Sequence, residues 1–248
     1  MKLALIGDPV EHSASPQLQR SFLEDADIDG SYVAIRVARG EAVAAIQRLR
    51  SEDYAGCNVT FPLKDESLAA CDQLTDEARR VHAVNTIFFG RDAIGTTTDG
   101  IGARMAVESL LDEPVALKRI GVLGYGATAR AILAELHDND AYTFIWGRDA
   151  GRVEAACRAY EASAWPQGNP PEIVISTLPP NAALPSSLIN QLQRADFVLD
   201  ANYGPRATLA HALHREVVAG DAMLAAQARA SFDFWLAHLD QWRRSESG

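Results

Sequence analysis

The sequence is poor in cysteine and contains no long hydrophobic run. Its 248 residues include only three cysteines: Cys57, Cys71 and Cys157 form no Cys-x-x-Cys pair and leave at least one thiol unpaired. This pattern favours a reducing compartment. The first apolar run ends at Gly7, too early for a signal peptide, and no run approaches the roughly 18 apolar residues that span a bilayer. We therefore expect a cytoplasmic protein that does not attach to membranes.

The chain has fewer basic than acidic residues, and it lacks several common catalytic motifs. The chain has 23 Lys and Arg against 33 Asp and Glu, a formal net charge of −10. Without a basic stripe, a nucleic-acid partner is not expected. The chain lacks the metalloprotease pattern His-Glu-x-x-His, the hydrolase pattern Gly-x-Ser-x-Gly and the P-loop pattern. We therefore expect no metal site, and nothing supports a serine hydrolase or a P-loop enzyme.

Short apolar runs rich in β-branched residues alternate with longer amphipathic stretches, a pattern typical of βα units. The expected strands are residues 2–6, 31–36, 57–60, 85–89, 119–123, 142–146, 172–176 and 197–200. The expected helices are residues 18–26, 40–49, 78–81, 101–111, 128–137, 150–160 and 221–244. Both halves look doubly wound on mostly parallel sheets, and we place a change of domain near residue 100.

A dinucleotide-binding pattern follows the expected strand 119–123. The turn reads Gly124-x-Gly126-x-x-Ala129 and leads directly into an expected helix. Gly124 permits a tight turn, Gly126 lets a pyrophosphate approach the backbone, and Ala129 allows close helix packing. The phosphates would lie at the N-terminus of the helix.

The end of the next expected strand bears on the choice of cofactor. NAD enzymes usually place a carboxylate there for the ribose 2′-hydroxyl, whereas this chain has Arg148, with Arg152 one helical turn later. Two guanidinium groups suit the 2′-phosphate of NADP. Asp149 is the counter-argument for NAD, but an aspartate there is also a preferred helix N-cap. NADP is the favoured cofactor, and NAD stays an alternative.

Four polar clusters lie at the ends of expected elements in the first half. They read Ser13-x-Ser15-Pro16, Asn58-x-Thr60-x-Pro62-x-Lys64, Ala83-Val-Asn85-Thr86 and Thr98-Asp99-Gly100. Each has a structural explanation when it is taken alone. For example, Ser15 could cap the helix that follows it, and Lys64 could be a solvated charge.

Taken together, the clusters closely resemble the shikimate 5-dehydrogenase family, which includes shikimate/quinate dehydrogenase-like proteins. The second half adds Asp200-x-x-Tyr203-x-Pro205 and Met223-Leu224-x-x-Gln227-Ala228, so the resemblance covers nearly the whole chain. It implies an α/β fold, with an N-terminal α/β substrate domain over residues 1–100 and a Rossmann-type NADP-binding domain over residues 101–220. It also implies that C-terminal helices over residues 221–248 return to the first domain, with the active site in the cleft between the domains.

The resemblance further implies an NADP-dependent oxidoreductase acting on a CH–OH group. Its reaction would be the reversible reduction of 3-dehydroshikimate to shikimate, a step of chorismate and aromatic amino acid biosynthesis. Lys64 is then the principal general acid/base, with Asp99 as its partner, since a lysine beside a carboxylate can exchange a proton with the reacting oxygen. The residues that the resemblance assigns to substrate binding are Ser13, Ser15, Asn58, Thr60, Asn85, Tyr203 and Gln227. Those assigned to the cofactor are Gly124, Tyr125, Gly126, Ala127, Thr128, Arg148, Arg152, Ser176 and Met223.

The chain departs from the family pattern at a few positions. His82 replaces the usual glycine before Ala-Val-Asn-Thr, and Thr97 replaces the usual asparagine before Thr-Asp. These departures leave room for a paralogue that acts on quinate or another cyclic hydroxy acid, with NADP or NAD. A non-catalytic nucleotide-binding protein on the same fold is the alternative from another class. Monomer and homodimer are both open.

Overall fold

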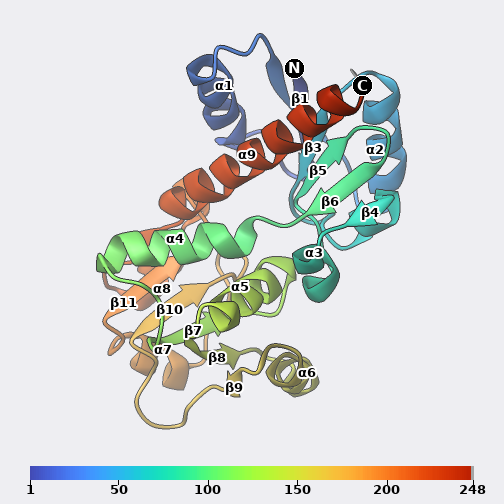
Figure 1. Cartoon of the computed structure of the whole chain (residues 1–248). Helices are drawn as coiled ribbons and strands as arrows, with labels where there is room; N and C mark the ends of the chain where they lie inside the picture. Colours follow the sequence, from blue (N-terminus) through green and yellow to red (C-terminus); the bar gives the residue numbers. More distant parts are fainter. Residues whose placement is uncertain (247–248) are drawn as a thin grey trace. The chain divides into compact units, whose positions relative to one another are not determined.

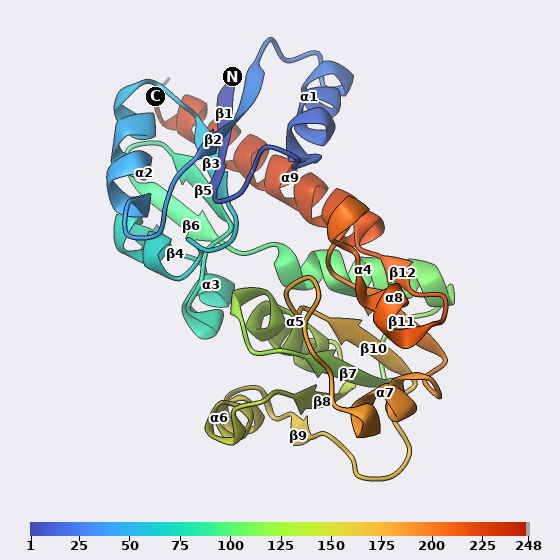
Figure 2. The same cartoon turned by 180° about the vertical axis from the view of Figure 1, so that it is seen from behind.

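The chain divides into two compact units (Figures 1 and 2). The structure, a computed structural model, describes residues 1–246, with side chains up to residue 239. Unit 1 contains residues 1–98 and the chain from Gln227 onwards, and unit 2 contains residues 99–226. The division expected after residue 100 differs from this one by two residues, because it assigned Asp99 and Gly100 to the first domain. They belong to unit 2 because they begin helix α4 (Asp99–Leu111), which packs on a helix of that unit.

Unit 1 is built on a six-stranded sheet with the order β2-β1-β3-β5-β6-β4. Its strands are β1 (Lys2–Gly7), β2 (Ser31–Arg36), β3 (Gly56–Val59), β4 (Gln73–Leu74), β5 (Thr86–Phe89) and β6 (Ala93–Thr96). Its helices are α1 (Ser15–Asp25), α2 (Ala42–Ser51), the 3₁₀ helix η1 (Glu66–Ala70), α3 (Asp76–Val81) and the part of α9 (Asp221–Glu246) that lies beyond residue 226. The four strands expected in this half are confirmed to within one residue at each end.

The expectation that this first sheet is mostly parallel is confirmed, because β1, β2, β3, β4 and β6 run in one direction, although the βα alternation breaks at β5. Strands β1, β2 and β3 are parallel, but β5 runs antiparallel to both β3 and β6. The sequence pattern missed β6, which pairs with β5 after a tight connection at Arg91 and Asp92. β5 and β6 therefore form a hairpin, and β6 returns to the direction of β3.

The sheet of unit 1 is covered on both faces. Ala4 and Ile6 of β1 belong to one apolar cluster with residues of α2. Leu3 and Leu5 belong to the cluster on the other face, which includes Trp235 of α9. This alternation is the two-residue period of a strand buried on both sides. The indole N–H of Trp235 also donates to a β5 carbonyl, that of Ile87, at 2.9 Å, which ties α9 to the sheet.

Unit 2 has the doubly wound parallel sheet that its half of the sequence predicts. The order is β12-β11-β10-β7-β8-β9, and every pair is parallel. Its strands are β7 (Arg119–Leu123), β8 (Tyr142–Trp146), β9 (Ser163–Ala164), β10 (Ile173–Ser176), β11 (Phe197–Asp200) and β12 (Val218–Ala219). Besides α4, its helices are α5 (Ala127–Asp138), α6 (Ala150–Tyr160), α7 (Ser186–Leu192), the 3₁₀ helix η2 (Gly204–Arg206), α8 (Leu209–Leu213) and the start of α9.

The strand order of unit 2 is that of a dinucleotide-binding Rossmann fold. The chain starts in the middle at β7, builds outwards to β9, and returns to β10 on the other side of β7. Ligands of such sheets bind beyond the carboxyl ends of the strands at this switch point. In the described part of the chain, no helix is long and apolar enough to cross a membrane.

Candidate active site

The predicted polar clusters of unit 1 converge on one edge of its sheet. β1 and β3 are parallel, so their carboxyl ends lie at the same edge. β5 is antiparallel to β3, and its first residue, Thr86, pairs with Asn58 near the end of β3. Thr86 also pairs with Thr96, the last residue of β6. The loops after β1, β3 and β6 therefore meet the turn before β5 (Figure 2).

The two serines occupy the loop between β1 and α1. The hydroxyl oxygen of Ser13 accepts a hydrogen bond from the backbone N–H of Ser15 at 3.2 Å. Ser15 is buried and is the first residue of α1, whereas Ala14 holds the N-cap position. The alternative reading of Ser15 as the N-cap is thus wrong by one residue. Paired hydroxyls at a helix start can donate to a carboxylate.

Backbone hydrogen bonds fix the positions of Thr60 and Lys64 beside the other polar residues. Thr60 donates its N–H to the carbonyl of Ile6 at 2.9 Å, at the end of β1. The Lys64 carbonyl accepts from the N–H of Val84 at 3.0 Å, next to Asn85. Both side chains are half-buried. The lysine therefore belongs to the sheet edge that also carries the predicted amide, rather than to a solvated loop elsewhere.

Behind this edge lies a buried polar network, consisting of Tyr32, Asn58, Asn85, Thr86, Thr98, Gln227 and Ser231. Asn58 occupies its centre. Its Oδ1 accepts from the Tyr32 hydroxyl at 2.8 Å, and its Nδ2 donates to Thr86 Oγ1 at 3.0 Å and Ser231 Oγ at 3.1 Å. Both ends of the Asn58 amide are therefore engaged within the protein, where the amide positions the neighbouring groups.

The network joins the predicted substrate residues Asn85 and Gln227. Asn85 Nδ2 donates to Thr98 Oγ1 at 3.0 Å and to Gln227 Oε1 at 3.3 Å. Asn85 Oδ1 accepts from the backbone N–H of Thr98 at 2.9 Å. The sequence reading missed the roles of Thr98 and Ser231. Both residues could have been found from their positions in the sequence. Thr98 directly precedes the predicted site residue Asp99, and Ser231 lies one helical turn after the predicted site residue Gln227.

Replacing Asn58 with leucine is expected to lower the free energy of unfolding by about 2 to 4 kcal/mol. Leucine has a similar volume but leaves the buried Tyr32 and Ser231 hydroxyls without their amide partner. Urea denaturation measures the change. Asn190→Leu on the exposed side of α7 is the control, with a change within about 0.5 kcal/mol. Equal stability of the two variants would contradict the structural role of Asn58.

The departure at His82 has a backbone explanation. His82 is exposed and follows the last residue of α3 with φ +52°, in the left-handed region. Glycine adopts this conformation without strain, and other residues adopt it less readily. Histidine in place of the family's usual glycine therefore makes the left-handed end of α3 less favourable. The exposed imidazole has no catalytic role in this interpretation.

In unit 2, the turn between β7 and α5 fits a dinucleotide. Gly124 has φ +106°, and a Cβ there would lie 2.7 Å from Thr177 Oγ1 after β10, so this position requires glycine. A Cβ at Gly126 would have no atom within 4 Å. Gly126 is the N-cap of α5 and provides no side-chain cap. The first turn of α5 thus offers backbone N–H donors beside open space, as a pyrophosphate requires.

The residues after β8 fit a phosphate on the adenosine side. Arg148 is exposed, and within the described part of the chain no hydrogen bond or ion pair holds its side chain. Asp149 caps α6 by accepting from the backbone N–H of Arg152 at 3.0 Å, and it also lies 3.8 Å from the Arg152 guanidinium. The carboxylate is therefore engaged in capping, which confirms that alternative for Asp149.

The other expected residues of unit 2 lie around the carboxyl ends of its strands or at the start of α9. Tyr125 stacks beneath the Arg130 guanidinium at 5.9 Å. Ser176 ends β10 and is buried, and Tyr203 is half-buried just before η2. Met223 is buried in the first turn of α9. Asp99 and Thr128 are joined directly, because the Thr128 hydroxyl donates to Asp99 Oδ2 at 2.9 Å.

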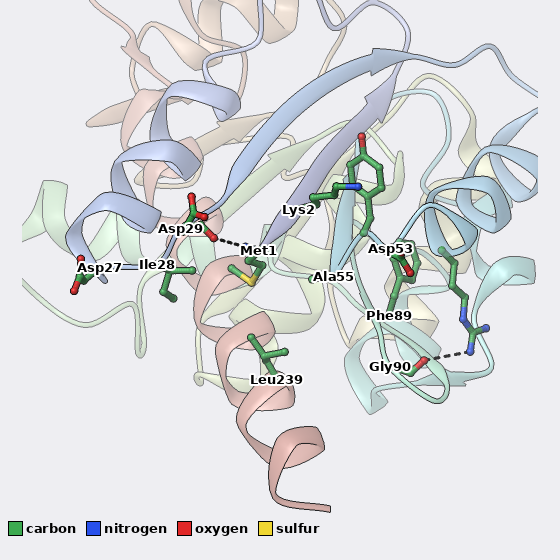
Figure 3. Close-up of a pocket in the computed structure, with 12 residues that line it drawn as sticks. Met1, Lys2, Asp27, Ile28, Asp29, Asp53, Ala55, Phe89, Gly90 and Leu239 are labelled. Carbon is green, nitrogen blue, oxygen red and sulfur yellow. Dashed lines mark hydrogen bonds between the residues drawn. The ribbon is translucent and has the colours of Figure 1, made fainter. Parts of the chain in front are cut away.

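Unit 1 also has a cavity that lies away from the predicted substrate residues of the same unit (Figure 3). It has a volume of about 590 Å³ and is lined at the start of β1 by Met1 and Lys2, together with Asp29 and Leu239. Figure 3 shows these side chains around the amino end of the strand, whereas the predicted substrate residues follow its carboxyl end. None of the predicted site residues lines this cavity.

Thiol and metal chemistry find no support in the described residues. Burial raises the pKa of the Cys71 thiol to about 12, and it also raises the pKa of Cys57 and of Cys157 above the ordinary value. The three thiols are therefore protonated at neutral pH and are poor nucleophiles. Among the side chains that the structure describes, no group of three or more His, Cys, Asp or Glu could hold a metal ion.

Known proteins resemble the chain over most of its length. Residues 5–87 match the family model of the shikimate dehydrogenase substrate binding domain. The shikimate dehydrogenase (NADP(+)) of Acidiphilium cryptum (strain JF-5) is 38% identical over 157 residues, which cover 63% of this chain and 56% of that protein. The shikimate dehydrogenase (NADP(+)) of Hyphomonas neptunium (strain ATCC 15444) is 32% identical over 257 residues, which cover 94% of this chain and 90% of that protein.

A solved structure extends the similarity to three dimensions. Shikimate 5-dehydrogenase from Thermus thermophilus, in complex with NADP(H) and shikimate, matches with a TM-score of 0.82 and 28% identity. The match covers 95% of this chain and 93% of that chain. Both units of the present chain therefore have counterparts in that structure.

Proposed function

Because the chain belongs to the shikimate dehydrogenase family, we propose that it catalyses the NADP-dependent, reversible reduction of 3-dehydroshikimate to shikimate. The observation that carries the proposal is the convergence of Ser13, Thr60, Lys64 and Asn85 at one edge of the unit 1 sheet. That edge lies in the segment that matches the substrate-binding family model. Unit 1 is then the substrate domain, and unit 2 is the NADP domain.

The substrate is held by hydroxyl and amide groups matched to its polar atoms. Ser13 and Ser15 hold the carboxylate, while Thr60, Asn85 and Gln227 bind the ring oxygens. Asn58 supports them through the buried polar network, which also contains Asn85 and Gln227. Tyr203 is proposed as a further residue for the carboxylate, as the family resemblance implies.

Proton transfer is the task of Lys64. Bound NADPH supplies the hydride to the ring carbon. Lys64 in its ammonium form donates the proton to the oxygen on that carbon, so that the ketone becomes an alcohol and the lysine becomes neutral. Asp99 binds the same hydroxyl and balances the lysine charge. In the oxidative direction, neutral Lys64 accepts the proton.

We infer the cofactor contacts from the open space at the start of α5 and from the exposed Arg148. The N-terminus of α5 beside Gly126 would hold the pyrophosphate of NADP, and Arg148 and Arg152 would bind its 2′-phosphate. Ser176 at the end of β10 and Met223 in the first turn of α9 would contact the nicotinamide end of the cofactor. Asp149 supports the preference for NADP over NAD, because its carboxylate accepts a hydrogen bond from the α6 backbone instead of one from a ribose hydroxyl.

Initial rates with four substrate pairs test the proposal. Purified protein is given shikimate or quinate with NADP⁺ or NAD⁺ at mildly alkaline pH, which favours proton release, and absorbance of the reduced cofactor is recorded. We expect the highest kcat/KM for shikimate with NADP⁺. A preference for quinate would indicate that the Thr97 departure has changed the pocket. Tight NADPH binding without turnover of either acid would favour the non-catalytic alternative.

A further inference from the structure

Asp99 and Thr128 connect the first turns of two helices in unit 2. Asp99 is the first residue of α4 and is 5% exposed. Thr128 is the second residue of α5, in the turn that fits the pyrophosphate. The Thr128 hydroxyl donates to Asp99 Oδ2 at 2.9 Å. A hydrogen bond to an ionised carboxylate is stronger and more directional than one between neutral groups.

Close packing of α4 on α5 makes this hydrogen bond possible. A Cβ at Gly100 would lie 2.5 Å from the Ala131 carbonyl oxygen and 2.7 Å from the Glu135 Cβ, so any side chain there would push the helices apart. One turn further along, the Arg104 Nε donates to Glu135 at 2.7 Å. α4 and α5 are therefore held together at two successive turns. This packing limits how far the Asp99 carboxylate can move away from Thr128.

The hydroxyl of Thr128 serves the carboxylate rather than a phosphate. A threonine hydroxyl has a single proton to donate, and here it points to Asp99. The same hydroxyl can therefore not donate to a phosphate oxygen at the same time. The backbone N–H groups of the α5 turn remain the phosphate donors, so the side chain of Thr128 has a separate role.

We propose that Thr128 is a positioning residue, whose hydroxyl fixes the Asp99 carboxylate in the orientation that its partnership with Lys64 and the substrate requires. This inference rests on the proposed function, in which Asp99 acts at the substrate. It reassigns the Thr128 side chain from the cofactor set to the proton-handling pair. The first turn of α5 then performs two tasks, with its backbone for the cofactor and one side chain for the catalytic carboxylate.

Thr128→Val tests the role of the hydroxyl, because valine keeps the shape and removes the donor. We expect kcat for shikimate oxidation to fall about 10- to 100-fold, the range for losing one hydrogen bond to a charged group. The dissociation constant of NADPH, measured by its fluorescence without substrate, is expected to stay within about twofold of wild type. Thr128→Ser restores the donor and is expected to recover kcat to within about threefold.

Two further variants serve as controls for the loss of the Thr128 hydroxyl. Thr143→Val makes the same change at a buried position on β8, and its kcat is expected to equal that of wild type. Thr128→Ala lacks the hydroxyl without adding a branched side chain, and it gives the same loss should the valine variant fail to fold. Circular dichroism and thermal unfolding verify the fold of each protein.

Three outcomes would overturn the assignment of Thr128. An unchanged kcat in Thr128→Val would show that the hydroxyl is dispensable. A weaker NADPH affinity with an unchanged kcat would return the side chain to the cofactor site. Failure of Thr128→Ser to recover activity would point to packing rather than hydrogen bonding. The wild-type rate is measured first, because a wild type without shikimate turnover contradicts the proposed function itself and the Thr128 assignment that depends on it.

Discussion

Replacing Lys64 with alanine is expected to lower kcat for shikimate oxidation by about 10² to 10⁴, the typical contribution of a general acid/base. The dissociation constant of NADPH is expected to remain nearly unchanged, because the dinucleotide turn belongs to the other unit. Lys64 is held by its backbone carbonyl to Val84, so the substitution leaves the loop anchored. Steady-state rates and fluorescence titration of NADPH measure the two effects.

Lys64→Arg separates proton transfer from simple charge. Arginine keeps the positive charge but cannot give up a proton in a protein, so this variant is expected to be nearly as inactive as the alanine variant. Lys118→Ala in unit 2 is the matched control, since that lysine pairs with Glu113 near the surface. Its kcat is expected to equal that of wild type. Near-normal turnover in either Lys64 variant would exclude Lys64 as the general acid/base.

Arg148→Ala is expected to raise KM for NADP⁺ about 10- to 100-fold, with KM for shikimate and kcat nearly unchanged. The physical reason is the loss of charge-assisted hydrogen bonds to the 2′-phosphate. KM for NAD⁺ is expected to stay the same, because that cofactor has no 2′-phosphate. Initial rates with each cofactor at saturating shikimate measure the selectivity directly.

An exposed arginine on the following helix provides the control for Arg148. Arg158 on α6 pairs with Glu154 within its own helix, and Arg158→Ala is expected to leave KM for NADP⁺ unchanged. An equal increase of KM for NADP⁺ and NAD⁺ in Arg148→Ala would argue against contact with the 2′-phosphate. The cofactor preference would then have to come from Arg152 or from the backbone.

The dinucleotide unit was the part of the fold that could be predicted best. Its strand, glycine turn and helix follow one another within a short segment, so that local sequence carries the whole pattern. Gly124 shows the physical basis, because its positive φ and its distance to Thr177 leave no room for a side chain. The strand order could also be expected, since right-handed βαβ crossovers allow few alternatives.

The topology of the first sheet could not be predicted in the same way. β6 is four residues long and contains Gly95, so its sequence offers little evidence for a strand. β5 runs antiparallel to both β3 and β6, which brings Asn85, the residue before β5, to the edge where β1 and β3 end. In an all-parallel sheet the start of β5 would lie at the opposite edge.

The hydrogen-bond partners of the predicted polar residues are absent from the sequence pattern. Asn58 and Asn85 look alike in their motifs, and the structure binds both amides within the protein, Asn58 to Tyr32, Thr86 and Ser231 and Asn85 to Thr98 and Gln227. Two of these partners, Gln227 and Ser231, come from α9, more than a hundred residues along the chain. A contact between segments so distant in sequence cannot be read from motif spacing.

Transfer of deuterium from cofactor to substrate tests the central claim most directly. Purified protein is mixed with 3-dehydroshikimate and NADPH that carries deuterium at both positions of the nicotinamide C4, and the product is analysed by mass spectrometry. The account predicts shikimate with one deuterium on the carbon that bears the new hydroxyl, formed in step with NADPH oxidation. Shikimate without deuterium, or no consumption of NADPH by a folded protein that binds it, would contradict the account.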